Sequence, residues 1–280
     1  MRSLLFVPAN VERYVVKAPT VGADAVILDL EDSVPEERKG EARRALRSAV
    51  RHLKSNSDAR VMVRVNAADT AHFKDDVTSS LEAGCDAIVF PKCNDAYTVE
   101  SLRRVVEEVG AEVSVIALIE SARGVLNLEG IARSWRSIEG LAFGVYDYSI
   151  SMETIFPSRG HLTVVKSLIA IAAKAYGLLA IDTPYAKVSD LQGLREESME
   201  AKALGFDGKL AVHPSQVPVI NEAFSPTGEE IEWARRVVSV MEAARSEGRS
   251  STMLEGNMVD EAHYRLARLV LSRHGVRGRP

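Results

Sequence analysis

The chain has 280 residues, which is enough for one large α/β domain or two small ones. Hydrophobic residues make up 46% of it and charged residues 26%, proportions that are ordinary for a soluble globular enzyme. The net charge of −4 argues against a nucleic acid or an anionic membrane as a partner. The apolar run within Met1–Asn10 is too short for a signal-peptide core or a membrane span, so we expect a cytoplasmic protein.

Eight short apolar runs follow one another along the chain, and most are continuous instead of alternating with polar residues. The predicted strands are Leu4–Val7, Ala25–Leu30, Val61–Val65, Ala87–Phe90, Val113–Ile119, Gly140–Phe143, Leu178–Asp182 and Lys209–Val212. Continuous apolar runs are typical of parallel strands that are buried on both faces. Cys85 and Cys93 flank one of these strands, and we interpret them as small core residues without a disulfide.

Stretches with helical periodicity separate the strands. The predicted helices are Val11–Thr20, Pro35–Leu53, Phe73–Ala83, Tyr97–Val109, Gly124–Ser134, a long helix that ends at Tyr176, Asp190–Ala203, Glu229–Glu247 and Asp260–Arg273, with a longer connection expected over Tyr148–Leu162. Eight strand–helix units in about 225 residues match a TIM (β/α)₈ barrel. A doubly wound sheet is the competing fold, but no Gly-x-Gly-x-x-Gly sequence follows the first strand.

The C-terminal part of the chain differs in composition from the barrel. We expect a catalytic barrel over residues 1–225 and a helical extension over residues 226–280. Within the extension, Arg245–Asn257 is polar and contains glycine and serine, so it is predicted to be a linker. The final helix could then act as a mobile lid or pack on a neighbouring subunit.

Residues at the carboxyl ends of the predicted strands should meet at one rim of the barrel, where such folds place their active sites. This set holds five acids and three basic or imidazole side chains: Phe6, Glu31, Asp32, Arg64, Lys92, Glu120, Asp147, Asp182 and His213. Purely structural strand ends would contain more Gly, Asn and Ser. The rim is therefore predicted to be an active site.

Two acids follow neighbouring buried strands, Glu120 after Ile119 and Asp147 shortly after Phe143. Carboxylates at matching ends of adjacent parallel strands would converge, and a divalent metal with oxygen ligands is the usual reason for such an arrangement. The alternative is that each acid caps the helix that follows it.

Other members of the set also have ordinary interpretations. Glu31 and Asp32 precede a helix that they could cap, and His213 before Pro214 could be a structural hydrogen-bonding group. Lys92 could form a Schiff base only if it were desolvated and neutral; beside so many acids, a protonated partner is the simpler interpretation. Arg64 could pair with the nearby acids, bind a substrate carboxylate, or both.

Several motifs together resemble the HpcH/HpaI aldolase and citrate lyase superfamily, with the strongest likeness to citrate lyase β subunits and malyl-CoA lyases. They span most of the chain in order and read RSLLFVPAN (2–10), LDLEDSV (28–34), VRVN (63–66), FPK (90–92), LIESARG (118–124), LAFGVYDY (141–148), GFDGKLAVHPSQV (205–217) and GNMVDEAHYRLA (256–267). The combination is far more specific than any one segment. The chain departs from the family pattern at Ala9, Val145-Tyr146, Gly248–Ser251 and Glu261-Ala262.

The resemblance implies a TIM barrel whose Mg²⁺ is held by Glu120 and Asp147. It implies that Arg64 contacts substrate oxygens and that Phe6 and Lys17 help to bind coenzyme A. It also implies homotrimers or hexamers, in which a C-terminal lid from one subunit brings an Asp, matched here by Asp260, to the neighbour's site.

The implied activity is Mg²⁺-dependent carbon–carbon cleavage, or formation, of a 3-hydroxyacyl thioester such as citryl-CoA or malyl-CoA. The products would be acetyl-CoA and an α-keto acid, by way of a thioester enolate. The alternatives are a malyl-CoA thioesterase on the same scaffold, a Schiff-base aldolase using Lys92, and a citrate lyase β subunit that acts on an acyl carrier protein within a complex. Tyr146, beside the expected metal site, is the first residue at which we look for substrate choice.

Overall fold

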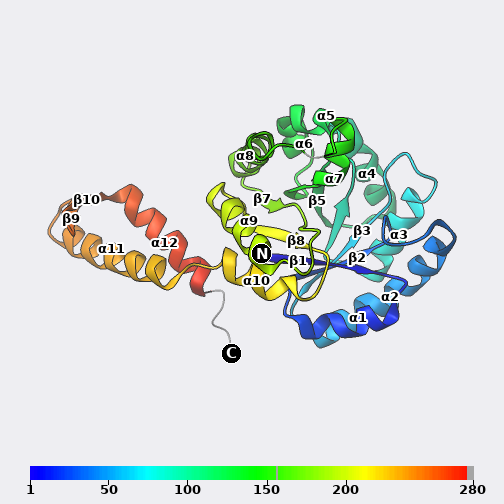
Figure 1. Cartoon of the computed structure of the whole chain (residues 1–280), viewed down its shortest axis with the longest axis horizontal. Helices are drawn as coiled ribbons and strands as arrows, with labels where there is room; N and C mark the ends of the chain where they lie inside the picture. Colours follow the sequence, from blue (N-terminus) through cyan, green and yellow to red (C-terminus); the bar gives the residue numbers. More distant parts are fainter. Residues whose placement is uncertain (156, 276–280) are drawn as a thin grey trace. The chain divides into compact units, whose positions relative to one another are not determined.

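The computed structural model describes residues 1–155 and 157–275, with side chains described through residue 272, and its first unit is a closed barrel of parallel strands (Figure 1). Each strand pairs with the next in sequence, and β1 closes the circle by pairing with β8. The strands are β1 (Ser3–Pro8), β2 (Ala25–Asp29), β3 (Arg60–Arg64), β4 (Ala87–Phe90), β5 (Ser114–Ile119), β6 (Ile138–Phe143), β7 (Leu179–Asp182) and β8 (Gly208–Ala211). The predicted TIM barrel is confirmed, and the doubly wound alternative is excluded because the sheet is closed.

Helices surround the barrel (Figure 1). They are α1 (Glu12–Lys17), η1 (Ala18–Val21), η2 (Glu36–Arg38), α2 (Lys39–Asn56), α3 (Phe73–Ala83), α4 (Ala96–Val109), α5 (Ala122–Leu126), α6 (Leu128–Ser134), α7 (Val145–Ser151), α8 (Arg159–Ala175), α9 (Leu191–Ala203) and α10 (Gln216–Phe224). Gly84 and Gly110 end α3 and α4 in the left-handed conformation, where glycine has no steric cost. Among the described residues, no helix combines the length and the apolar character required to traverse a lipid bilayer.

Alternate residues of each strand point to opposite sides of the barrel wall. One side forms a small cluster that fills the barrel interior, made of Leu4, Ala25, Ile27, Met62, Ala87, Val89, Ile116, Leu118, Ala142, Ile181 and Leu210. The other side packs with the helices in a larger outer layer. Free Cys85 and buried Cys93 belong to that outer layer, as the sequence predicted. Which side a rim residue faces is therefore decided by its position relative to these interior residues.

Three regions of the barrel unit differ from the expected elements. The predicted connection over Tyr148–Leu162 is wrong at its start, because α7 follows β6 after the single residue Gly144. The predicted helix over Gly124–Ser134 is two helices, α5 and α6, which meet at Asn127. Helix α10, after the His213-Pro214 turn, was not predicted. These elements are short, and periodicity is a weak signal over so few residues.

The second compact unit begins at Ser225 and contains α11 (Gly228–Ser246), β9 (Ser251–Leu254), β10 (Asn257–Asp260) and α12 (Glu261–Gly275). Thr227 and Glu230 form a capping box at the start of α11. The segment Arg245–Asn257, predicted to be a linker, contains the end of α11 and most of an antiparallel hairpin formed by β9 and β10. Glu255 and Gly256 both have positive φ, 52° and 82°, the geometry of a two-residue hairpin turn that matches strand twist.

Candidate active site

An arginine lies at the centre of the rim formed by the carboxyl ends of β1–β3. Arg64 ends β3 and is the register partner of Asp29 at the end of β2. Its Nε and Nη2 each donate to Asp29 at 2.7 Å, while Nη1 donates to Asp32 at 3.1 Å and lies 3.1 Å from Glu31. The guanidinium carbon also lies 4.6 Å from the ring centroid of Phe6, a cation–π contact. Arg64 is thus fixed from several sides.

Asp29 is a rim residue that the sequence analysis did not select. It is fully buried, and besides Arg64 it accepts hydrogen bonds from the amides of Glu31 and Ser33 and from the Ser33 hydroxyl. Burial alone would raise the pKa of Asp29. The charge and hydrogen bonds of Arg64, and the hydrogen bonds from Ser33 and from the Glu31 amide, instead hold this pKa below its usual value. Asp29 is therefore the buried counter-ion that orients Arg64.

Glu120 directly follows β5. It lies two residues after the interior residue Leu118, so it faces the barrel interior as Leu118 does. Its Oε2 accepts a hydrogen bond of 2.9 Å from the amide of Lys92, which has a positive φ of 53°. A Cβ atom at Gly144 would lie 2.4 Å from Oε1, so glycine at that position makes room for the carboxylate. Burial is the main cause that raises the pKa of Glu120 to about 7, and the nearby charge of Asp147 adds to it. The hydrogen bond from the Lys92 amide and the charge of Arg64 lower the pKa but do not cancel this rise.

Glu31 is a third buried acid on the rim. Burial raises its pKa to about 8; Arg64 opposes this, whereas Asp32 and Glu120 add to it. The Lys92 ammonium lies 3.8 Å from the Glu31 carboxylate, and the side chain of Lys92 is 48% exposed. An exposed lysine beside a carboxylate lacks the desolvated environment that a Schiff-base lysine needs. The structure therefore disfavours the aldolase alternative.

Asp147 lies in the first turn of α7, so it extends from a helix and does not end a strand as predicted. Its carboxylate makes no hydrogen bond or ion pair with the other described residues, and its charge acts on Glu120. The Thr183 hydroxyl, beyond the end of β7, accepts a hydrogen bond of 3.1 Å from the amide of Val145 and so fixes the start of α7. The sequence analysis missed Thr183.

None of the rim acids acts as a helix cap. Ser121 caps α5 with its side chain, and the residues that begin η2, α2 and α7 have no side-chain cap. Side-chain capping by Glu120, Glu31 and Asp32 is therefore wrong, whereas Asp147 lies in the first turn of α7, where an acid stabilises a helix N-terminus as that interpretation predicted. The partners of Glu31, Asp32 and Glu120 are instead Arg64 and the Lys92 amide.

A buried polar chain supports the turn that carries Glu31. The Lys39 ammonium donates to the carbonyls of Leu30 and Glu31, both at 3.0 Å, and to the side chain of Asn66 at 2.8 Å. The Asn66 side-chain amide in turn donates to Asp76, which is fully buried, at 2.5 Å. A buried lysine in an amphipathic helix could have indicated this network, because buried lysines require partners.

Several predicted site residues do not contact Arg64 or Glu120. The prediction of Asp182 as a rim residue is wrong. Asp182 faces the outer layer, where its carboxylate lies 2.6 Å from the Lys209 ammonium and 3.0 Å from that of Lys166. His213 is exposed and bonds to Ser215, as its structural interpretation predicted. Lys17 is an exposed residue at the end of α1.

Asp260 belongs to the second unit, where its carboxylate accepts hydrogen bonds from the amides of Ala262 and His263 at the start of α12. The His263 ring bonds to the same carboxylate at 2.7 Å and is the main reason that the pKa of Asp260 is lowered. Asp260 is thus a carboxylate, not a carboxylic acid, at neutral pH.

The described part of the chain holds no cluster of three or more His, Cys, Asp or Glu side chains that would enclose a metal ion. The rim instead offers Glu120 and Asp147, with Glu31 beyond them. Buried acids with raised pKa values are sites where a cation would stabilise the ionised form. Two carboxylates leave coordination positions open, which fits a metal whose remaining ligands are substrate oxygens and water.

The two raised pKa values predict how the stability of the metal-free protein depends on pH. Above a pH of 4.5 the folded protein retains protons that the unfolded chain has released, up to about 7 on Glu120 and up to about 8 on Glu31. Stability therefore falls as the pH rises through this range. We expect the Tm of metal-free protein to be lower at about pH 8.5 than at about pH 5.5, and the Glu31→Gln variant to show a smaller difference. A Tm that rises over the same interval would contradict the assignment.

A family model described as HpcH/HpaI aldolase/citrate lyase matches residues 2–214. The chain belongs to this family. It is 35% identical to the (3S)-malyl-CoA thioesterase of Cereibacter sphaeroides (strain ATCC 17025) over 97% of this chain and 94% of the relative. It is also 35% identical to citrate lyase subunit beta of Escherichia coli K12 over 99% of this chain and 94% of that subunit.

The solved structure of CitE from Mycobacterium tuberculosis in complex with magnesium, acetoacetate and coenzyme A shares the fold of this family member. Its TM-score is 0.80 at 35% identity, and the match covers 98% of both chains. The resemblance stated from the sequence motifs is therefore confirmed at the level of family and fold. The relatives are named as enzymes of more than one reaction type, so family membership alone does not select the reaction.

Proposed function

We propose that the protein is a Mg²⁺-dependent carbon–carbon lyase that cleaves or forms a 3-hydroxyacyl thioester such as citryl-CoA or malyl-CoA. The observation that carries this proposal is a pair of nearby carboxylates, Glu120 and Asp147, on a rim whose arginine is fixed by buried Asp29. The complexes of the similar CitE with magnesium, acetoacetate and coenzyme A support the same choice of metal and substrate class. A CoA thioester as substrate also fits the expected cytoplasmic location.

Glu120 and Asp147 would hold the Mg²⁺, because this ion prefers oxygen ligands and retains open positions for water and substrate. When bound there, the ion would supply Lewis-acid polarisation of the substrate oxygen next to the bond that breaks. The Lys92 amide holds Glu120 in one orientation through its hydrogen bond. Gly144 leaves the space that this orientation requires.

Arg64 would stabilise the negative charge that develops on the thioester oxygen of the enolate. Three hydrogen bonds to Asp29 and Asp32 use three of its five N–H donors, which leaves two for Glu31 and a substrate oxygen. Since the guanidinium is already oriented before substrate binds, it needs little reorganisation during the reaction, which is the basis of electrostatic catalysis.

Asp260 is proposed to transfer the proton at the enolate carbon, from the C-terminal unit of a neighbouring subunit in a homotrimer or hexamer. Its carboxylate is ionised at neutral pH, which suits removal of a proton in the direction of synthesis. In the direction of cleavage the same group would first have to be protonated. The C-terminal unit would then function as a lid over the neighbour's rim.

Phe6 and Lys17 are proposed to bind the coenzyme A part of the substrate. The Phe6 ring is partly exposed and already carries Arg64 on one face, so it lies at the site itself. Lys17 makes no ion pair within the described part of the chain and could pair with a phosphate group. Tyr146 is 54% exposed beside Asp147 and remains our proposal for the residue that selects the acyl group.

Two alternatives are supported by named relatives. The similarity to a (3S)-malyl-CoA thioesterase favours hydrolysis of malyl-CoA to malate and CoA. The similarity to citrate lyase subunit beta favours action on an acyl carrier protein thioester within a complex. Both would use the same rim.

The test is to incubate purified protein with malyl-CoA and with citryl-CoA, each with Mg²⁺ and with EDTA, and to identify the products. A lyase gives acetyl-CoA with glyoxylate or oxaloacetate, and EDTA abolishes the activity. Free malate with CoA identifies the thioesterase. Activity that appears only when an acyl carrier protein bears the substrate identifies the subunit role, and activity that EDTA leaves unchanged refutes the metal-dependent mechanism.

A further inference from the structure

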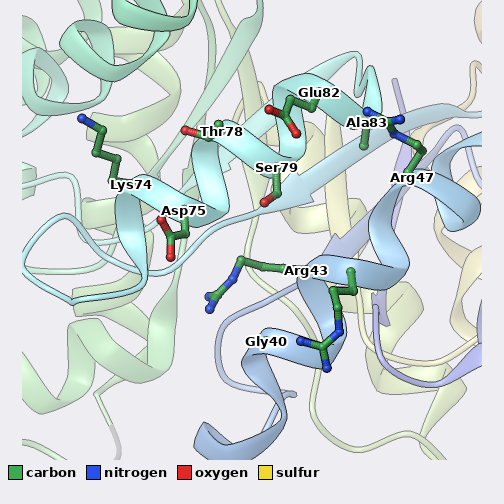
Figure 2. Close-up of a pocket in the computed structure, with 10 residues that line it drawn as sticks. Gly40, Arg43, Arg47, Lys74, Asp75, Thr78, Ser79, Glu82 and Ala83 are labelled. Carbon is green, nitrogen blue, oxygen red and sulfur yellow. The ribbon is translucent and has the colours of Figure 1, made fainter.

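A groove with a volume of about 530 Å³ lies between α2 and α3 (Figure 2), and none of the rim residues described above lines it. It is lined by Gly40, Arg43, Arg44, Arg47, Lys74, Asp75, Thr78, Ser79, Glu82 and Ala83. The α2 wall contributes three arginines, and the α3 wall contributes two hydroxyl groups, one lysine and two acids. Nothing in the proposed reaction uses these residues.

Two of the three arginines of the α2 wall lie over Gly40 at the start of the helix. A Cβ atom placed on Gly40 would lie 3.5 Å from Nη1 of Arg44 and 4.0 Å from Nη2 of Arg43. Two guanidinium groups therefore approach one point at the start of α2, and glycine at position 40 leaves that point open. Like charges held together repel each other, and an anion placed between them would relieve the repulsion.

The cations of the groove differ in whether the protein already neutralises them. Arg43 pairs with buried Asp76 at 2.9 Å and Lys74 pairs with Glu108 at 2.7 Å. Within the described chain, Arg44 and Arg47 make no ion pair or hydrogen bond, although the charge of Arg44 acts on nearby Glu41, and both arginines are exposed. Three residues apart on one helix, they lie on the same face, about one turn from each other.

The opposite wall supplies neutral donors. Thr78 and Ser79 line the groove, and their hydroxyls make no hydrogen bond among the residues that the structure describes. The neighbouring Ser80, by contrast, bonds back to its own helix. Figure 2 shows Arg43 and Arg47 on the α2 side and Ser79 on the α3 side of the space between the helices. Guanidinium groups on one wall and hydroxyls on the other are the donors that phosphate oxygens accept.

We propose that this groove binds a diphosphate group, either as the free inorganic anion or as part of a nucleotide. Arg44 and Arg47 provide the charge and the free donors, Arg43 supplies a donor that Asp76 does not use, and Thr78 and Ser79 complete the contacts from α3. Glu82, also on the α3 wall, opposes the anion. The site is separate from the proposed active site and goes beyond the proposed activity.

The experiment is isothermal titration of the full-length protein with inorganic diphosphate and, separately, with ADP, in metal-free buffer without competing anions. We expect both to bind, and we expect the Arg44→Gln/Arg47→Gln double variant to bind roughly tenfold more weakly or worse. Glu82→Gln should bind more tightly than the wild type, because it removes a like charge from the opposite wall. Arg235→Gln, which removes an exposed arginine of α11, is the matched control and should bind as the wild type does.

The two ligands distinguish the source of the diphosphate group. Equal affinity for both identifies a site for the anion alone, and tighter binding of ADP identifies a nucleotide site; either result supports the proposal. The proposal is overturned if neither ligand binds, or if the double variant binds both as well as the wild type. All substituted side chains are exposed, and the Tm of each variant verifies that it is folded.

Discussion

The Glu120→Gln variant is expected to lose more than about 99% of its Mg²⁺-dependent activity, since even residues that only support a metal ligand change affinity or activity by about 10–100-fold. It should also lose most of its affinity for Mg²⁺, measured by titration without substrate. The metal-free variant should unfold at a higher temperature than the wild type at about pH 8, because it removes a buried acid that is ionised above a pKa of about 7. Weaker function with greater stability is the combination expected of a functional residue.

The control is Glu112→Gln, which makes the same change at an exposed residue just before β5, the strand that Glu120 follows. It should leave activity, metal affinity and Tm unchanged. Gly144→Ala tests the position of the Glu120 side chain without altering it, since the new Cβ would lie 2.4 Å from Oε1. We expect weaker Mg²⁺ binding in that variant. Gly130→Ala should bind Mg²⁺ as the wild type does, because a Cβ atom there would have no atom within 4 Å apart from its chain neighbours and its own helix backbone. Full EDTA-sensitive activity in Glu120→Gln would refute the metal role.

The barrel could be predicted from the sequence because its strands are buried on both sides. Continuous apolar runs such as Ala87–Phe90 leave little freedom in placing a strand, and that prediction matches β4 residue for residue. Helices that are long and end at glycine were predicted nearly as well; α3 over Phe73–Ala83 is an example. The short elements α7 and α10 were missed because one or two helical turns contain too few apolar positions to show a period.

The rim was predicted less well than the fold, and the reason is the alternation along each strand. Taking the last residue of a predicted strand ignores which side it faces. Asp182 follows the interior residue Ile181, so it faces outward to Lys209. Asp29 lies two residues after the interior residue Ile27 and therefore faces inward, yet it was passed over for Glu31 and Asp32. Counting in steps of two from the interior residues would have separated these cases.

The hairpin in the C-terminal unit shows a different limit. Its composition resembles a linker, because polar and small residues dominate Arg245–Asn257. What makes it a hairpin is the turn at Glu255-Gly256, in which a non-glycine residue adopts positive φ. Glutamate is not a residue that predicts this conformation, so the turn could not be recognised from residue type alone. The position of Asp260 at the end of β10 depends on that turn.

Asp29→Asn is expected to destabilise the protein by about 3–5 kcal/mol, the usual cost of removing one partner of a buried ion pair. Asp29 is fully buried and binds Arg64 through both carboxylate oxygens, so the neutral amide leaves the arginine without its closest counter-ion. The measurement is urea unfolding of metal-free protein, together with kcat and KM. We expect kcat to fall, because an arginine held less firmly stabilises the enolate oxygen less well.

Asp32→Asn is the matched control, since Asp32 binds the same guanidinium at 3.1 Å from an exposed position. Surface ion pairs contribute about 0–1 kcal/mol, so this variant should unfold nearly as the wild type does. If both variants lost the same stability, burial would not distinguish the two acids, and Asp29 would not be the residue that orients Arg64. A large loss confined to Asp29→Asn would show that the arginine of the rim is positioned from inside the barrel.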